Sequence, residues 1–111
     1  MDVEARKEGS VLVVKSLNKR LDAHIAMEFK QKMSDYISRG NDLIVLDISE
    51  VEFIDSSGLG AIVSALKLLG GNGDLVIAGT RDSVMRMFKL TRMNKVFNMF
   101  DTEREAVDSL S

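Results

Sequence analysis

The residues best suited to chemistry lie in one short stretch, Phe53-Ile54-Asp55-Ser56-Ser57-Gly58-Leu59-Gly60. An aspartate precedes two serine hydroxyls and two glycines follow them, between an apolar run and an amphipathic segment. Asp and Ser are preferred helix N-caps, because their oxygens accept hydrogen bonds from the free amides of the first turn. The stretch therefore reads as a helix start, and its chemistry could be that of a nucleophile, a phosphate site or a modified serine.

The first two of these functions need residues that the chain supplies only in part. A nucleophile elbow requires Gly-x-Ser-x-Gly, and Asp55 stands where the glycine before Ser57 is needed. The single histidine, His24, leaves a small serine hydrolase using Ser56 and His24 as an alternative. A P-loop requires a lysine directly after its last glycine, and here none follows until Lys67. A helix N-terminus still attracts anions weakly through its free amides and dipole.

The third possibility is that another protein modifies a serine of this stretch. Ser56 follows a predicted central strand, where loop side chains are exposed on a rigid base. Phosphorylation would add close to two negative charges beside Asp55. A helix N-terminus tolerates negative charge, so such a site could switch binding without unfolding the domain.

Alternating strands and helices must position this stretch. Apolar runs predict strands at 11–17, 43–48, 75–78 and 95–100, the last at a sheet edge, and weak alternation suggests another at 2–7. Helices are expected after Asp22, across the quoted stretch, after Thr80 or Asp82, and after a Thr102–Glu105 capping box. The order ββαβαβαβα predicts one α/β domain over residues 1–111. We expect a mixed, mostly parallel sheet of about five strands with about four helices.

Composition narrows the function classes further. The chain has 111 residues, 45% of them apolar and 29% charged, as in an ordinary globular domain. Its net charge of −2 gives no basic footprint for nucleic acid, and no apolar run is long enough to span a membrane. The charged N-terminus lacks the apolar core of a signal peptide, and the chain has no cysteine. The absence of cysteine is compatible with the cytosol, and a single histidine excludes a multi-histidine metal site within one chain.

The stretch closely resembles the signature of STAS-domain anti-sigma factor antagonists, the SpoIIAA/RsbV group. The resemblance runs from about Val11 to Leu110 and includes Arg20-Leu21-Asp22-Ala23 and the segment 84–91. It departs from the family before the Leu-Asp pair, where family members often have a glycine and this chain has Leu17-Asn18-Lys19-Arg20. That departure bears on the loop shape and on the choice of partner.

The resemblance implies partner switching in a signal-transduction pathway that controls transcription. It implies a cytoplasmic protein that is not an enzyme and holds no cofactor or metal. The unmodified protein would bind an anti-sigma factor that is also a GHKL-type serine kinase, which frees the sigma factor. Phosphorylation of Ser56 would release the kinase, and a metal-dependent serine phosphatase would reset the switch. The implied partner-binding residues are Asp22, Asp55, Ser56, Ser57, Gly58, Leu59 and Gly60. Helical spacing after Ser57 adds Ala61, Ser64 and Lys67 as candidates on the same face. The alternative is a STAS accessory subunit of a transport or signalling complex that is never phosphorylated.

Overall fold

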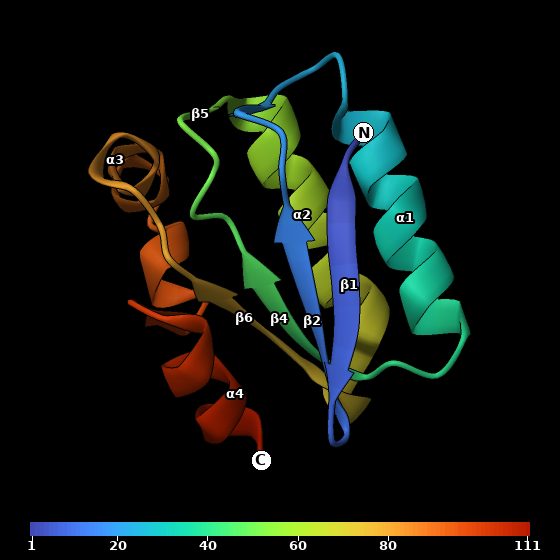
Figure 1. Cartoon of the computed structure of the whole chain (residues 1–111). Helices are drawn as coiled ribbons and strands as arrows, with labels where there is room; N and C mark the ends of the chain where they lie inside the picture. The colour runs from blue at the N-terminus through green and yellow to red at the C-terminus, as the bar shows by residue number, and fades with distance from the viewer.

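A five-stranded sheet forms the middle layer of the computed structural model, which describes all 111 residues (Figure 1). Its strands are β1 (Val3–Glu8), β2 (Val11–Ser16), β4 (Leu43–Asp47), β6 (Asp74–Ala78) and β7 (Met99–Phe100). They lie in the order β1-β2-β4-β6-β7. The β1-β2 hairpin is antiparallel and every other neighbouring pair is parallel. The predicted mixed, mostly parallel sheet is confirmed.

Four helices cover the sheet, as expected. They are α1 (Ala26–Ser38), α2 (Ser56–Leu69), α3 (Asp82–Leu90) and α4 (Glu103–Leu110), with short 3-10 turns η1 (Gly70–Asn72) and η2 (Met93–Lys95). Figure 1 shows α1 and α2 side by side on one face of the sheet and α4 on the other. The α3 segment lies beside the end of the sheet, next to β5 (Phe53–Ile54).

Strict alternation along the central strands explains this three-layer arrangement. In β4, Ile44 and Leu46 belong to the large apolar cluster under α1, α2 and α3. Val45, between them, belongs to a smaller cluster with Ala106 and Val107 of α4. Because successive strand side chains point to opposite faces, a continuous apolar run is buried only when helices cover both faces.

A second sheet of only two short strands was not predicted. β3 (Arg20–Leu21) and β5 (Phe53–Ile54) pair in parallel, with Leu21 opposite Ile54. β3 follows β2 and β5 follows β4, so both lie beyond the carboxyl ends of parallel strands. This pairing brings the segments that precede α1 and α2 together.

The predicted capping residues of the first and third helices, Asp22 and Thr80 or Asp82, are wrong, although α3 begins at Asp82 as expected. Asp22 instead begins a separate turn: its Oδ1 accepts from the His24 amide at 3.1 Å, and α1 starts only at Ala26. The N-cap of α3 is Arg81, whose side chain makes no cap. Arg81 Nε donates to the Ser49 carbonyl at 2.8 Å, so a tertiary contact fixes this helix start.

The predicted strand at 95–100 is also shorter than expected. Residues 93–95 form η2, and only Met99–Phe100 pair with β6, at the sheet edge as predicted. Phe97 turns inward instead and packs edge-on against Phe88 of α3, with ring centroids 6.1 Å apart.

The predicted cap of α4 is present, since Thr102 Oγ1 accepts from the Glu105 amide at 3.2 Å. The Glu105 carboxylate accepts from the Thr102 hydroxyl rather than from its amide.

Candidate functional site

Asp55 joins the start of α2 to the segment before α1. It is the N-cap of α2 and has an extended backbone. Its Oδ1 accepts from the Gly58 amide at 2.9 Å, which satisfies one of the free donors of the first turn. Its Oδ2 accepts from the Ala23 amide at 3.2 Å. A single carboxylate therefore fixes the helix start against the turn that begins at Asp22.

The two glycines of the motif have different surroundings. Gly58 is buried, and a Cβ at that position would overlap the carbonyl oxygen of Leu21. Close approach of β3 to α2 therefore requires glycine there. Gly60 is exposed, and a Cβ there would meet nothing within 4 Å. Close packing therefore requires glycine at position 58 but not at position 60.

Ser56 is the first residue of α2 and is exposed to solvent, as is Ser57. The Ser56 hydroxyl makes no hydrogen bond within the chain, although the cap beside it is fully formed. Leu59, one turn later, is only 5% exposed and belongs to the core. In the first turn of α2, Ser56 and Ser57 are therefore exposed while Leu59 packs into the core.

Asp22 lies beside the start of α2. The pairing of β3 with β5 brings the two segments together, and the amide of Ala23, the next residue, donates to Asp55. Its carboxylate accepts from Arg20 Nε at 3.1 Å. That hydrogen bond lowers the pKa of Asp22 below its usual value, and the His24 amide adds to the effect. The motif thus has two carboxylates next to the exposed Ser56.

Two residues of this surface were missed from the sequence. Phe53 is 41% exposed although its neighbour Ile54 is buried. The Arg20 guanidinium lies over the Phe53 ring, 4.2 Å from the centroid, as in a cation–π contact. Only the pairing of β3 with β5 brings these side chains together, and no local pattern predicts that pairing.

An open groove of about 410 Å³ extends from Ser56 along the exposed face of α2. The helix contributes Ser56, Leu59, Gly60, Val63, Ser64 and Lys67 to its lining. Thr91 and Met93, from the segment around η2, form the opposite wall. Ser64 and Lys67 lie on the predicted face. Ala61 does not, because it is only 5% exposed and packs into the core.

The Ser56–His24 pair that a hydrolase would need is not formed. His24 is exposed in the turn before α1, and its side chain makes no hydrogen bond. The backbone amide of His24 donates to Asp22. No base therefore contacts the Ser56 hydroxyl, and no contact supports the hydrolase alternative.

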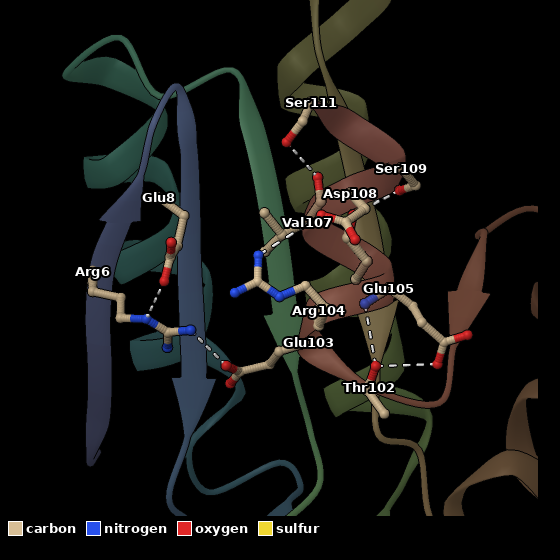
Figure 2. A network of polar contacts seen from close by, with 11 residues as sticks. Arg6, Glu8, Thr102, Glu103, Arg104, Glu105, Val107, Asp108, Ser109 and Ser111 are labelled. Atoms are coloured by element: carbon tan, nitrogen blue, oxygen red, sulfur yellow. Dashed lines mark hydrogen bonds and ion pairs between the residues drawn. The ribbon is translucent and has the colours of Figure 1, made fainter.

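A separate polar network lies on the α4 side of the sheet. Figure 2 shows Arg6 of β1 between Glu8 and Glu103, with distances of 3.2 Å to Glu8 and 2.7 Å to Glu103. Asp47, at the end of β4, is 5% exposed, and its Oδ1 accepts from the Ser49 amide at 2.8 Å. A hydrogen bond with Asp47, together with burial, raises the pKa of Glu103.

The model of the STAS domain family matches residues 2–106 of this chain. A provisionally named anti-sigma factor antagonist of Thermotoga maritima is 32% identical over 101 residues, 89% of each chain. The anti-sigma F factor antagonist of Paenibacillus polymyxa is 29% identical over 112 residues, covering 99% of this chain and 95% of the relative.

The solved structure of the Bacillus cell fate determinant SpoIIAA in its phosphorylated form has a TM-score of 0.75 and 21% identity. The match covers 99% of this chain and 100% of that one, and it concerns the fold alone. No helix here has the length and apolar character needed to cross a bilayer. By its match to the family model and to these relatives, the chain belongs to the STAS domain family, among members named anti-sigma factor antagonists.

Proposed function

We propose that this protein is an anti-sigma factor antagonist that a serine kinase switches off by phosphorylating Ser56. In the unmodified state it binds an anti-sigma factor that is also the kinase, and this frees the sigma factor in the cytoplasm. Phosphorylation releases the kinase, and a metal-dependent serine phosphatase restores the binding state. The chain itself performs no catalysis in this cycle.

The observation that carries the proposal is the exposed and unbonded hydroxyl of Ser56 on a rigid support. The Asp55 cap and the buried Leu59 fix the backbone on either side of it. A kinase can therefore reach the hydroxyl without unfolding the helix. The relatives' names, and a solved SpoIIAA structure in the phosphorylated form, support the same assignment.

Helix electrostatics explain why a phosphate here would change binding more than folding. The amides of Ser56 and Ser57 lie in the first turn of α2 and have no partner within the helix. A phosphate of about −1.5 to −2 charge is stabilised by such amides and by the helix dipole. On the outer surface it adds to the carboxylates of Asp22 and Asp55, so the potential next to Ser56 becomes more negative. A partner that must bury this surface would then face uncompensated charge.

The two neighbouring serines provide a matched test of phosphorylation. The kinase is first recovered by pull-down from the native cell and identified. Wild type, Ser56→Ala and Ser57→Ala are then incubated with it and ATP, and intact mass is measured. We expect wild type and Ser57→Ala to gain one phosphate and Ser56→Ala to gain none. Equal labelling of Ser56→Ala and wild type would contradict the proposal. If intact mass of the protein purified from its own cell shows no phosphate in any growth state, the accessory-subunit alternative is favoured.

Binding tests the charge mechanism itself. Ser56→Ala adds no charge at this position and should bind the partner of the unphosphorylated protein normally. Ser56→Asp places one charge where the partner must desolvate it, which typically costs about 2–5 kcal/mol. That corresponds to binding roughly 30-fold to a few thousand-fold weaker, with the lower end expected because aspartate carries less charge than phosphoserine. Calorimetric titration measures this, with thermal melts to verify folding. Equal affinity of folded Ser56→Asp and wild type would contradict the mechanism.

A further inference from the structure

The charges of this chain are unevenly divided between the groove walls and the rest of the surface. Residues 56–73 and 83–100, which supply all the groove-lining side chains, contain no Asp or Glu and five Lys or Arg. The remaining 75 residues carry ten Lys or Arg and all seventeen acidic residues. A chain with a net charge of −2 thus has one region of +5 against a remainder of −7.

The five cations of this region are free of intramolecular partners. They are Lys67, Arg86, Lys89, Arg92 and Lys95, and all five are exposed. None of them takes part in an ion pair, while four of the ten Lys or Arg residues elsewhere in the chain do, namely Arg6, Lys19, Arg20 and Arg104. The nearest acidic neighbour on α3 is Asp82, which lines a separate hollow together with Arg86 and Lys89 but forms no ion pair with either.

Of these five cations, only Lys67 lines the groove, and Arg92 lies between the lining residues Thr91 and Met93. Val63 and Met93 face each other across the groove, and Ser56 lies at one end with Lys67 at the other. Eleven residues of helix separate Ser56 from Lys67, which is about 16 Å along the axis. Close to Met93, Leu90 is 75% exposed and Val96 is 52% exposed. Such large exposed apolar side chains beside a groove are typical of a protein-binding surface.

Gly60 supplies an additional argument for an occupant. Glycine inside a helix costs about 0.8–1 kcal/mol relative to alanine. Nothing within the chain requires it, since a Cβ at Gly60 would meet no atom within 4 Å. The absence of a Cβ at Gly60 leaves the groove wider next to Ser56.

We propose that this groove binds an acidic amphipathic segment of the partner protein, of about three helical turns. Apolar side chains of the segment pack on Val63 and Met93, while its carboxylates pair with the cations around the groove. A flat membrane surface would leave the groove unfilled, so the shape favours a protein segment. The identification of that partner with the anti-sigma factor rests on the function proposed above.

The position of Ser56 at the end of the groove connects the two proposals. A phosphate of about −2 there would reduce the local charge from +5 to about +3 and repel an acidic segment. The same modification would occupy the end of the groove beside Gly60. Phosphorylation at Ser56 would thus weaken the attraction and block part of the site.

An unbiased peptide selection tests the proposal with the full chain. A displayed library of random peptides of about 16 residues is selected against wild type, and enriched peptides are titrated into labelled protein by NMR. Two variants with equal charge change are compared: Lys89→Glu/Lys95→Glu beside the groove, and Lys30→Glu/Arg39→Glu on α1. Both pairs are exposed, and each includes a residue at the end of a helix.

We expect acidic amphipathic peptides whose shift changes cluster at Gly60, Val63 and Met93. Their affinity should fall by about tenfold or more in Lys89→Glu/Lys95→Glu and stay within about twofold in Lys30→Glu/Arg39→Glu. No enrichment, enrichment of non-acidic peptides, or shifts outside the groove would overturn the proposal. So would equal weakening by both variants, or binding of phosphatidylglycerol vesicles that depends on Lys89 and Lys95. Because the selection needs neither kinase nor ATP, its failure and the failure of Ser56 phosphorylation are separate results.

Discussion

At the scale of single residues, Gly58 and Gly60 differ only in what lies next to the Cα atom. Gly58→Ala would force its Cβ into the backbone carbonyl of Leu21, which cannot move as a side chain can. We expect it to lower the free energy of unfolding by about 1–3 kcal/mol or more. Gly60→Ala meets nothing and should raise that free energy by up to about 1 kcal/mol. Urea denaturation of both variants measures this. A Gly58→Ala protein as stable as wild type would show that β3 does not approach α2 this closely.

The two oxygens of Asp55 can be separated by two substitutions. Asp55→Ala removes both acceptors and should cost about 0.5–2 kcal/mol as a lost N-cap. Asp55→Asn can still accept from the Gly58 amide through its remaining oxygen, but its NH₂ cannot accept from Ala23. We expect its stability to lie between those of Asp55→Ala and wild type in the same urea experiment. If Asp55→Asn equals wild type, the bond from Ala23 does not contribute to stability.

At the scale of elements, the parts that local chemistry determines were predictable. The Asp55-Ser56-Ser57 cap and the apolar stripe after it predict the start of α2, because N-cap contacts form within one turn. β4 and β6 were evident as continuous apolar runs. In contrast, α3 begins where Arg81 reaches Ser49, a contact across 32 positions. The position of this start was predicted, but the long-range contact that holds Arg81 there leaves no local signal in the sequence.

The same distinction applies to the candidate site. Ser56 was found because its neighbours in sequence are also its neighbours in space. Arg20 lies over Phe53 only because β3 pairs with β5, and Met93 faces α2 only because η2 ends the α3 segment there. Two-residue strands carry too little periodicity to be recognised. The far wall of the groove therefore required the structure.

At the scale of the whole molecule, one polar network ties the N-terminal hairpin to the last helix across the sheet. Burial acts to raise the pKa of Asp47, but hydrogen bonds from Glu103 and Ser49 outweigh it, so the net shift is downward. The hydrogen bond with Asp47, followed by burial, raises the pKa of Glu103, and Arg6 opposes this only in part. Of the two carboxyl groups, Glu103 is therefore the one that loses its proton at the higher pH.

The direction of these shifts predicts how stability depends on pH. A carboxyl group whose folded pKa is raised adds stability that is complete below its unfolded pKa and is lost as pH rises through the folded value. Asp47 has the opposite sign, and its contribution is lost only as pH falls through its depressed folded pKa. On the Glu103 side, rising pH leaves two carboxylates facing each other, so this network becomes less stabilising toward neutral pH.

Glu103→Gln should remove this loss of stability at rising pH, because an amide side chain can donate to Asp47 at every pH. It gives up the ion pair with Arg6, but that guanidinium is 52% exposed, and exposed pairs contribute only about 0–1 kcal/mol. Relative to wild type, we therefore expect its free energy of unfolding to improve as pH rises from the ordinary glutamate range through the raised pKa of Glu103. Glu8→Gln is the matched control, since Glu8 also pairs with Arg6 but has no part in the shift of Asp47. Urea titrations across this range measure the difference. If Glu103→Gln and Glu8→Gln follow the same pH profile, then the hydrogen bond with Asp47 does not raise the pKa of Glu103, and α4 is held to the sheet by its apolar face alone.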